Sequence, residues 1–418
     1  MTTPPSPTAC CPEYAAVTRR GLLAGAAALA GTSTVIGSAV VRASAAAPVP
    51  ARAVLVVLSL RGAADGLSLV VPHGDPAYYA ARPNIAVPRE RLLGADAMFG
   101  LHPSLAPLLP LWDSGRLAAV HATGLPAPNR SHFSAMEEVE DADPGSGKRE
   151  GWLNRLIGAD ATTSPLQGFA MGGGVPPASL FGDAPFVSAP DVESMTIAGH
   201  DEWDTGDRRL ASLHRLWDGD RSAMGAAMRS TLRAVEDFQP VRETPEQPAH
   251  GAAYPSGDLG DAMREVARIV RGDVGVEVIT VDQGDWDHHT GLGTPDNGRL
   301  KRNADELAAA VAAFFTDLGG LADDVTLVTI SEFGRRVQEN GNRGLDHGYG
   351  NVMFLAGAGV DGGRYLGTWP GLQDTTDADL LVTTDYRSVL AEVVTKRFGA
   401  SVASVFPQFQ PEAVGAMR

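Results

Sequence analysis

Residues 53–60 (AVLVVLSL) constrain the fold more than any other segment of this chain. The run is continuously apolar and rich in β-branched residues, which is typical of a strand covered by helices on both faces. Further runs predict strands at 117–121, 274–281, 325–330 and 352–355, and the Ala-rich segment 305–318 has apolar residues at helical spacing. Strands that alternate with helices in this way predict an α/β layered domain with a largely parallel central sheet.

The rest of the chain is expected to belong to the same domain. Three more segments predict helices, at 105–112, 254–269 and 385–398. The region 141–250 is richer in Gly, Pro and Asp and has weak periodicity. We therefore predict a single domain over residues 46–418, with an insertion around 141–250 that covers one edge of the sheet or the functional site.

The N-terminus has the features of an export signal. Arg19 and Arg20 precede an apolar stretch at 21–41, and Ala43-Ser44-Ala45 supplies the small residues that a signal peptidase needs. The paired arginines predict the twin-arginine route, with the translocase as a transient partner, cleavage after Ala45 and a destination outside the cytoplasm: extracellular, cell-wall or periplasmic. A membrane anchor is the alternative, but Gly, Ser and Thr dilute the stretch.

Composition narrows the chemistry. Both cysteines, Cys10 and Cys11, precede the arginine pair, so a mature chain would have no thiol. Any metal site must then use oxygen and imidazole ligands. The formal net charge is −16, with 34 basic and 50 acidic residues, which argues against a nucleic-acid surface.

Polar residues follow four of the five predicted strands. In parallel sheets these positions meet at the carboxyl edge, where ligands bind. In chain order they are Asp65; Arg130, Ser131 and His132; Asp282, Asp287 and His289; Glu332 and Arg335; and Asp346 and His347.

This inventory suits a divalent metal such as Zn, Mn, Ca or Mg, with no organic cofactor. A metal site could activate Ser131 as a nucleophile while Arg130 holds an oxyanion. Each residue also has a structural interpretation: Asp65 and Ser131 as helix caps or turn residues, His132 as a packed histidine, and Glu332 as the partner of Arg335.

The motifs RGAADGL (61–67), NRSHF (129–133), WDHH (286–289), SEFGR (331–335) and DHG (346–348) resemble those of domain-of-unknown-function family 1501. LHP (101–103), RP (82–83) and GWL (151–153) extend the resemblance over essentially the whole mature chain. The family consists of twin-arginine-exported bacterial proteins and is similar at the fold level to the alkaline phosphatase and sulfatase superfamily.

The resemblance implies roles for individual residues. Asp65 matches a first-strand metal ligand, and Ser131 lies near the position of the nucleophile. Asp282 or Asp287 with His289 resembles the third-strand ligands, and Asp346 with His347 resembles an Asp-His ligand pair. Glu332, Arg335 and His132 are further candidates. No histidine follows His347, so the late ligand of two-metal phosphatases has no counterpart.

Two functions are compatible with these expectations. The first is an exported metal-dependent hydrolase that acts on small phosphate or sulfate esters. The second is a non-catalytic exported binding or assembly protein that keeps the fold with a degraded site and has an unknown exported partner.

Overall fold

The computed structural model describes residues 33–418 except 37–38, 43–50, 160–163, 198–205 and 207. Its strands are β1 (Ser33–Ile36), β2 (Ala39–Arg42), β3 (Val54–Leu60), β4 (Val70–Val71), β5 (Gly100–Leu101), β6 (Leu117–Gly124), β7 (Gly168–Met171), β8 (Val187–Ala189), β9 (Val278–Gln283), β10 (Val325–Ile330), β11 (Asn351–Gly357), β12 (Arg364–Leu366) and β13 (Thr384–Asp385).

The α-helices are α2 (Gly66–Leu69), α3 (Pro76–Ala81), α4 (Leu109–Asp113), α5 (His132–Asp141), α6 (Trp152–Ile157), α7 (Arg208–Trp217), α8 (Ala223–Asp237), α9 (Gln239–Glu243), α10 (Asp258–Gly272), α11 (Arg299–Leu318), α12 (Tyr386–Phe398) and α13 (Val402–Val405). Short 3-10 helices are η2 (Arg89–Arg91), η3 (Pro103–Leu108), η4 (Pro165–Gln167), η5 (Ala178–Leu180) and η6 (Gly319–Asp323).

The large sheet has the strand order β1-β2-β8-β7-β9-β3-β10-β11-β6-β12, and β13 also pairs with β6. The five neighbours β8, β7, β9, β3 and β10 are parallel, whereas β11 runs antiparallel to both β10 and β6. The prediction of an α/β domain with a largely parallel central sheet is confirmed.

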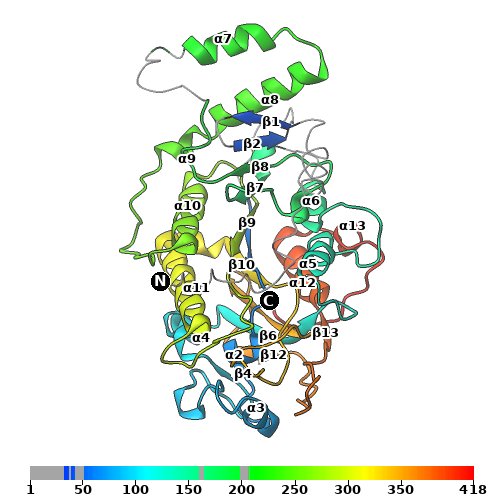
Figure 1. Ribbon diagram of the computed structural model, residues 1–418. Helices are drawn as coiled ribbons and strands as arrows, with labels where there is room; N and C mark the ends of the chain where they lie inside the picture. Colours follow the sequence, from blue (N-terminus) through cyan, green and yellow to red (C-terminus); the bar gives the residue numbers. More distant parts are fainter. Residues whose placement is uncertain (1–32, 37–38, 43–50, 160–163, 198–205, 207) are drawn as a thin grey trace, which may run out of the picture.

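Helices cover both faces of this sheet. In Figure 1, α10 and α11 lie on one side, and α5, α6, α12 and α13 lie on the other. The side chains of β3 alternate accordingly: Val56 and Leu58 belong to the core under α10 and α11, while Leu55 and Val57 belong to the core under α5, α6 and α12. All seven residues of β3 are buried, as its unbroken apolar run predicts.

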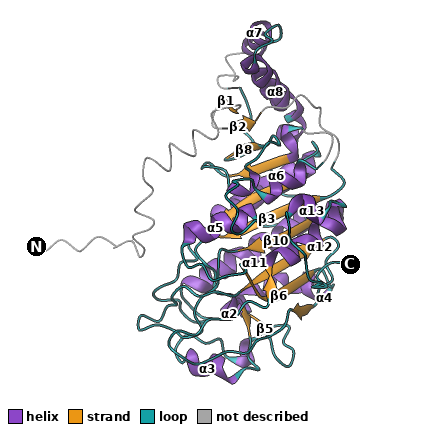
Figure 2. Ribbon diagram, turned by 90° about the vertical axis from the view of Figure 1, so that its right-hand side faces the viewer, coloured by secondary structure: helices purple, strands orange, loops and turns teal. Residues whose placement is uncertain are grey.

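The region 141–250, expected to be an insertion, contributes β7 and β8 to the main sheet itself. At that end of the sheet, α8 packs against the edge strands β1 and β2, and α7 lies farther out, beyond α8 (Figure 2). Glycine and proline separate the short elements, so hydrophobic periodicity is weak there although two strands are buried.

The predicted export signal falls largely outside the described residues, including Arg19, Arg20, both cysteines and the cleavage position at Ala45. Within the predicted leader, β1 and β2 pair with each other, and β2 pairs with β8. In the part of the chain that is described, no helix is long and apolar enough to cross a bilayer.

Candidate metal centre

The site lies where several strand ends meet. Parallel neighbours β9, β3 and β10 end at the same edge of the sheet. Asp287 and His289 follow β9, and Arg335 follows β10. His132 is the first residue of α5, which follows β6, and His347 lies between β10 and β11. Segments up to 215 residues apart in sequence therefore meet at one rim.

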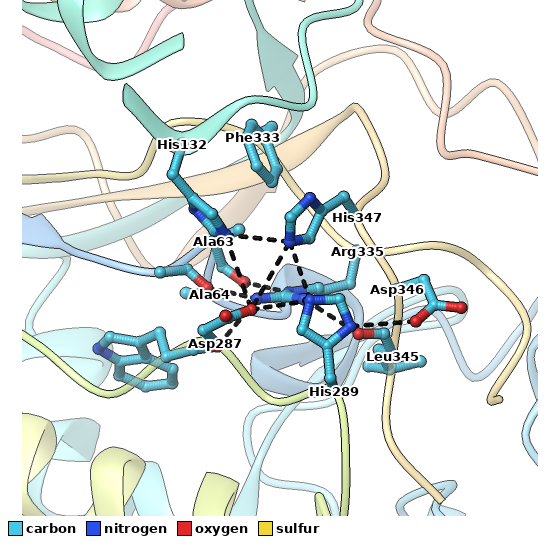
Figure 3. Close-up of polar contacts among 12 residues, drawn as sticks. Ala63, Ala64, His132, Asp287, His289, Phe333, Arg335, Leu345, Asp346 and His347 are labelled. Atoms are coloured by element: carbon cyan, nitrogen blue, oxygen red, sulfur yellow. Dashed lines mark hydrogen bonds and ion pairs between the residues drawn. The ribbon is translucent and has the colours of Figure 1, made fainter. Parts of the chain in front are cut away.

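Three imidazole nitrogens and one carboxylate oxygen converge there (Figure 3). The Nε2 atom of His347 is 3.0 Å from Nε2 of His132 and 2.9 Å from Nε2 of His289. The Oδ1 atom of Asp287 is 3.1 Å from Nε2 of His289, 3.6 Å from that of His347 and 3.7 Å from that of His132. Four potential ligand atoms thus face one another.

Each imidazole is oriented through its other nitrogen. The Nδ1 atom of His132 is 2.7 Å from the Glu332 carboxylate, and Nδ1 of His289 is 3.0 Å from the Asp346 carboxylate. His347 Nδ1 lies 2.9 Å from the backbone carbonyl of Arg130, which can only accept, so this Nδ1 carries the proton. A neutral ring in that tautomer presents the lone pair of Nε2 to the cluster, as metal-binding histidines do.

Arg335 holds Asp287 in place from behind. Its fully buried guanidinium is 2.6 Å from Asp287 Oδ1 and also donates to the backbone carbonyls of Gly62, Ala63 and Leu345. Gly62 permits the loop after β3 to approach the loop after β9. It has φ +106°, and a Cβ there would lie 2.6 Å from the backbone nitrogen of Asp287. The loop after β3 is therefore locked against the loop after β9.

Electrostatics favour charged groups at this rim. Burial raises the pKa of Asp287, but hydrogen bonds from His132, His289, His347 and Arg335 outweigh it and hold that pKa well below its usual range. Burial lowers the pKa of His132, but Asp287 and Glu332 outweigh it and raise the pKa to about 9. The cluster therefore attracts positive charge, supplied by a proton or by a cation.

The donor set and spacing fit a divalent metal. His132, Asp287 and His347 each offer a ligand atom within 4.8 Å of the others. Two ligands at about 2.0–2.2 Å from one zinc lie about 3–3.5 Å apart, close to the separations of 3.0, 3.6 and 3.7 Å within this group. Without a cation, a proton on His132, whose pKa is raised to about 9, separates these nitrogens, and a bound metal would take its place.

Three sequence-predicted ligands do not join the cluster, and one of them, Asp346, instead contacts Nδ1 of His289. Asp65 is buried and paired with Arg82, with oxygen–nitrogen distances of 2.6 and 3.0 Å. Arg82 is itself fully buried and needs this counter-charge, because an isolated guanidinium in the interior is costly. Asp282, half exposed, pairs with Arg61 at 3.1 Å. Of the two third-strand candidates, the structure brings only Asp287 to the histidines.

The other candidates lie at the rim in different roles. Ser131 is the N-cap residue of α5, but its side chain makes no capping hydrogen bond. The guanidinium of Arg130 is ion-paired with Asp379, and its carbonyl orients His347. Glu332 does not pair with Arg335. It is buried, and it accepts from the backbone N–H of Gly62 and from His132.

Sequence reasoning undervalued His132 and missed Asn340. The sequence leaves His132 open as a packed histidine or a further site candidate, and the structure places one of the converging nitrogens on it. Asn340 donates to the same Asp346 oxygen that orients His289. The NRSH motif at a strand end was the available signal for His132, whereas nothing in the sequence distinguished Asn340.

Comparisons with known proteins identify the family. No curated protein matches the chain. Among solved structures, it is similar to a protein in the alkaline phosphatase superfamily from Vibrio parahaemolyticus (13% identity, 84% of this chain and 72% of that one, TM-score 0.29). It is also similar to the PsFucS1 sulfatase from Pseudoalteromonas sp. (10% identity, 88% and 74%, TM-score 0.35). At these scores the similarity says nothing of activity. The model of a protein family of unknown function, DUF1501, matches residues 52–399, so this chain belongs to that family.

Proposed function

We propose that this protein is a metal-dependent hydrolase of small phosphate or sulfate esters. The observation that carries the proposal is the convergence of three imidazole nitrogens and Asp287 Oδ1, with each imidazole oriented through its second nitrogen. A purely structural cluster of histidines has no need of three such supporting partners.

The residues of the chain would divide the work. His132, His347 and Asp287 would hold the ion, with His289 against the same edge, and Arg335 would keep Asp287 ionised and fixed. A divalent ion supplies Lewis acidity and lowers the pKa of a water or hydroxyl bound beside it. The side chains of His289 and His347 are 21% and 17% exposed, so a small ester can approach the rim from solvent.

Ser131 is the nucleophile in this proposal. It is adjacent in sequence to His132, and its hydroxyl is not used to cap α5. To bind the transferring group, Arg130 would exchange its exposed ion pair with Asp379 for the anionic substrate. Such an exposed pair is worth only about 0–1 kcal/mol, so the exchange is energetically inexpensive.

A specific observation also supports the second candidate, a non-catalytic binding or assembly protein. Arg335, whose guanidinium contacts Asp287, and Arg130, whose backbone carbonyl contacts His347, are both paired with carboxylates. If both arginines remain ion-paired with these carboxylates, the rim could hold a metal without binding an anionic ester.

Metal content and hydrolysis of chromogenic phosphate and sulfate esters separate the two functions. Wild type should contain about one equivalent of metal and hydrolyse at least one ester. His347→Ala should lose both properties, while His214→Ala, on α7 and away from the cluster, should keep both. Ser131→Ala should keep the metal and the thermal stability but lose hydrolysis by orders of magnitude. Wild type that lacks the metal, or that holds it without hydrolysing any ester, supports the binding protein and contradicts the hydrolase.

Export by the twin-arginine route is part of the proposal, supported by the Arg19–Arg20 pair and the thiol-free chain after Cys11. Replacing both arginines with lysine should trap the precursor in the cytoplasm, as fractionation and immunoblotting would show. Unchanged export of that variant contradicts the route without affecting the metal site.

A further inference from the structure

A cavity of about 580 Å³ lies at the carboxyl ends of β7, β8 and β9, and none of the metal-centre residues lines it. After β7 the chain continues through η5, which packs on α5 and α6. After β9 it continues through α11, on the opposite face of the sheet. Such divergence between neighbouring parallel strands leaves a crevice that typically binds ligands.

Two hydroxyls flank the floor of this cavity. Ala170 of β7 is paired in register with Ser188 of β8 on one side and with Thr280 of β9 on the other. Ser188 and Thr280 are each 4% exposed, and neither hydroxyl has a hydrogen-bond partner among the described residues. Both residues line the cavity, so their unpaired hydroxyls are available to a polar ligand there.

Three consecutive glycines line part of the mouth of the cavity. Gly172, Gly173 and Gly174 follow β7 and line the opening. A Cβ on Gly172 or Gly174 would meet nothing within 4 Å, and one on Gly173 would lie 3.6 Å from Pro190. The glycines therefore keep the entrance wide.

One wall of the cavity is a row of carboxylates on α10. Asp258, Asp261 and Glu265 are spaced so that they share one helix face, and they extend over about 10 Å along the axis. Asp191 and Asp282 also line the cavity, and Arg264 is the only cation among the lining residues. Asp261 is ion-paired with Arg264 of the same helix at 3.1 Å, whereas Asp258 has no ion-pair partner in the described chain.

The separation of these carboxylates excludes a single small ion as the ligand. Within the described residues, the group of three or more metal-type side chains that approach within 4.8 Å is His132, Asp287 and His347, and none of these lines the cavity. A charge spread along a helix face suits an elongated cation with several separate charges.

We infer that this cavity binds a linear aliphatic polyamine. Its ammonium groups would donate to the α10 carboxylates, and the Ser188 and Thr280 hydroxyls would accept from the end that reaches the floor. The methylene groups would lie against Ala170 and Val175, a valine that is 60% exposed at the mouth. This inference does not depend on the proposed hydrolase activity.

Calorimetric titration of spermidine into the purified chain at constant ionic strength tests the inference. Wild type should bind one equivalent, and Asp258→Asn/Asp261→Asn should weaken binding at least tenfold. Asp113→Asn is the matched control, since it removes an exposed carboxylate from the end of α4, outside the cavity. Thr280→Val, which keeps the side-chain volume, should weaken binding several-fold without unfolding the strand.

Three outcomes would overturn the inference: no saturable binding by wild type, equal weakening in Asp113→Asn, or displacement of spermidine by an equimolar amount of Mg²⁺. His347→Ala should bind spermidine as wild type does. That result would keep the cavity separate from the metal centre, whatever the fate of the hydrolase proposal.

Discussion

His288 and His289 are adjacent in the chain and have opposite environments. His289 lies at the rim, with Nδ1 on Asp346 and Nε2 against Asp287 and His347. His288 is 1% exposed, and neither of its nitrogens has a hydrogen-bond partner in the described chain. One side chain is oriented by polar partners and the other is packed in the interior. The hydrogen-bond partners of a histidine, and not its burial, therefore distinguish a candidate metal ligand from a packed side chain in this protein.

The pKa values also distinguish the rim histidine from the buried one. The hydrogen bond to Asp287 raises the pKa of His289, whereas burial lowers that of His288 to about 3. His121 in β6 belongs with His288: it stacks on Phe99 at 4.2 Å, and burial lowers its pKa to about 3. The rim therefore accumulates positive charge, while the interior excludes it.

Two buried carboxylate–arginine pairs give the largest expected effects. Asp287→Asn and Asp65→Asn each leave a fully buried guanidinium without its counter-charge, on Arg335 and Arg82 respectively. Each should lower the free energy of unfolding of the metal-free protein by about 3–5 kcal/mol. Denaturant titration measures this loss. Asp65→Asn should cost more, because Asp65 is 1% exposed and Asp287 15%.

Metal binding distinguishes the two variants. Asp287→Asn should lose the metal, and Asp65→Asn should keep it, because Asp65 contacts Arg82 and not the cluster. Loss of metal from a folded Asp65→Asn protein would indicate that Asp65 is a ligand and would contradict its assignment as only the counter-charge of Arg82.

Acid pH should destabilise the fold through the buried histidines, of which His121 is the test case. The folded-state pKa of His121 is about 3 and the unfolded value is about 6.5, so protons bind preferentially to the unfolded chain between these values. The contribution to stability is complete above pH 6.5 and falls by about 1.4 kcal/mol per pH unit below it. His121→Phe should therefore remove about 2 kcal/mol of the stability loss that wild type shows on going to pH 5.

Unfolding curves at pH 7 and pH 5 measure this difference. His214→Phe is the control, because His214 is a half-buried histidine whose hydrogen bond to Asp218 raises its pKa and does not lower it. If His121→Phe and wild type lose equal stability between the two pH values, His121 is not the source of acid sensitivity.

The fold was largely predictable because buried strands have strong local patterns. The prediction for β10 (325–330) matches its observed bounds, and that for β3 begins one residue early. β9 begins at Val278, four residues after the predicted start, because the apolar pattern extends back beyond the residues that pair with β3. The antiparallel direction of β11 was not predictable, since a buried run reads the same either way.

The candidate site was predictable only in part. Strand-end position brings Asp287 and His289 to the rim, where they lie close to His347. Position could not show that Asp65 pairs with Arg82, because the sequence does not reveal which carboxylate meets a buried guanidinium. His132 depends on Glu332, 200 residues away, so no local pattern separates it from a packed histidine.

The smallest predicted effect tests whether the hydrogen bond that orients His289 strengthens metal binding, as the comparison of His288 with His289 implies. Asp346 is 53% exposed and orients His289 through Nδ1. Asp346→Ala should weaken metal affinity about tenfold, at the low end of the 10–100-fold range for residues that orient a ligand, and should barely change stability. Asp346→Asn is the matched variant, because its amide oxygen can still accept from Nδ1. Competition with a chromogenic chelator measures both affinities. Equal affinity in wild type and Asp346→Ala would show that His289 is not a ligand, leaving His132, Asp287 and His347 to hold the ion.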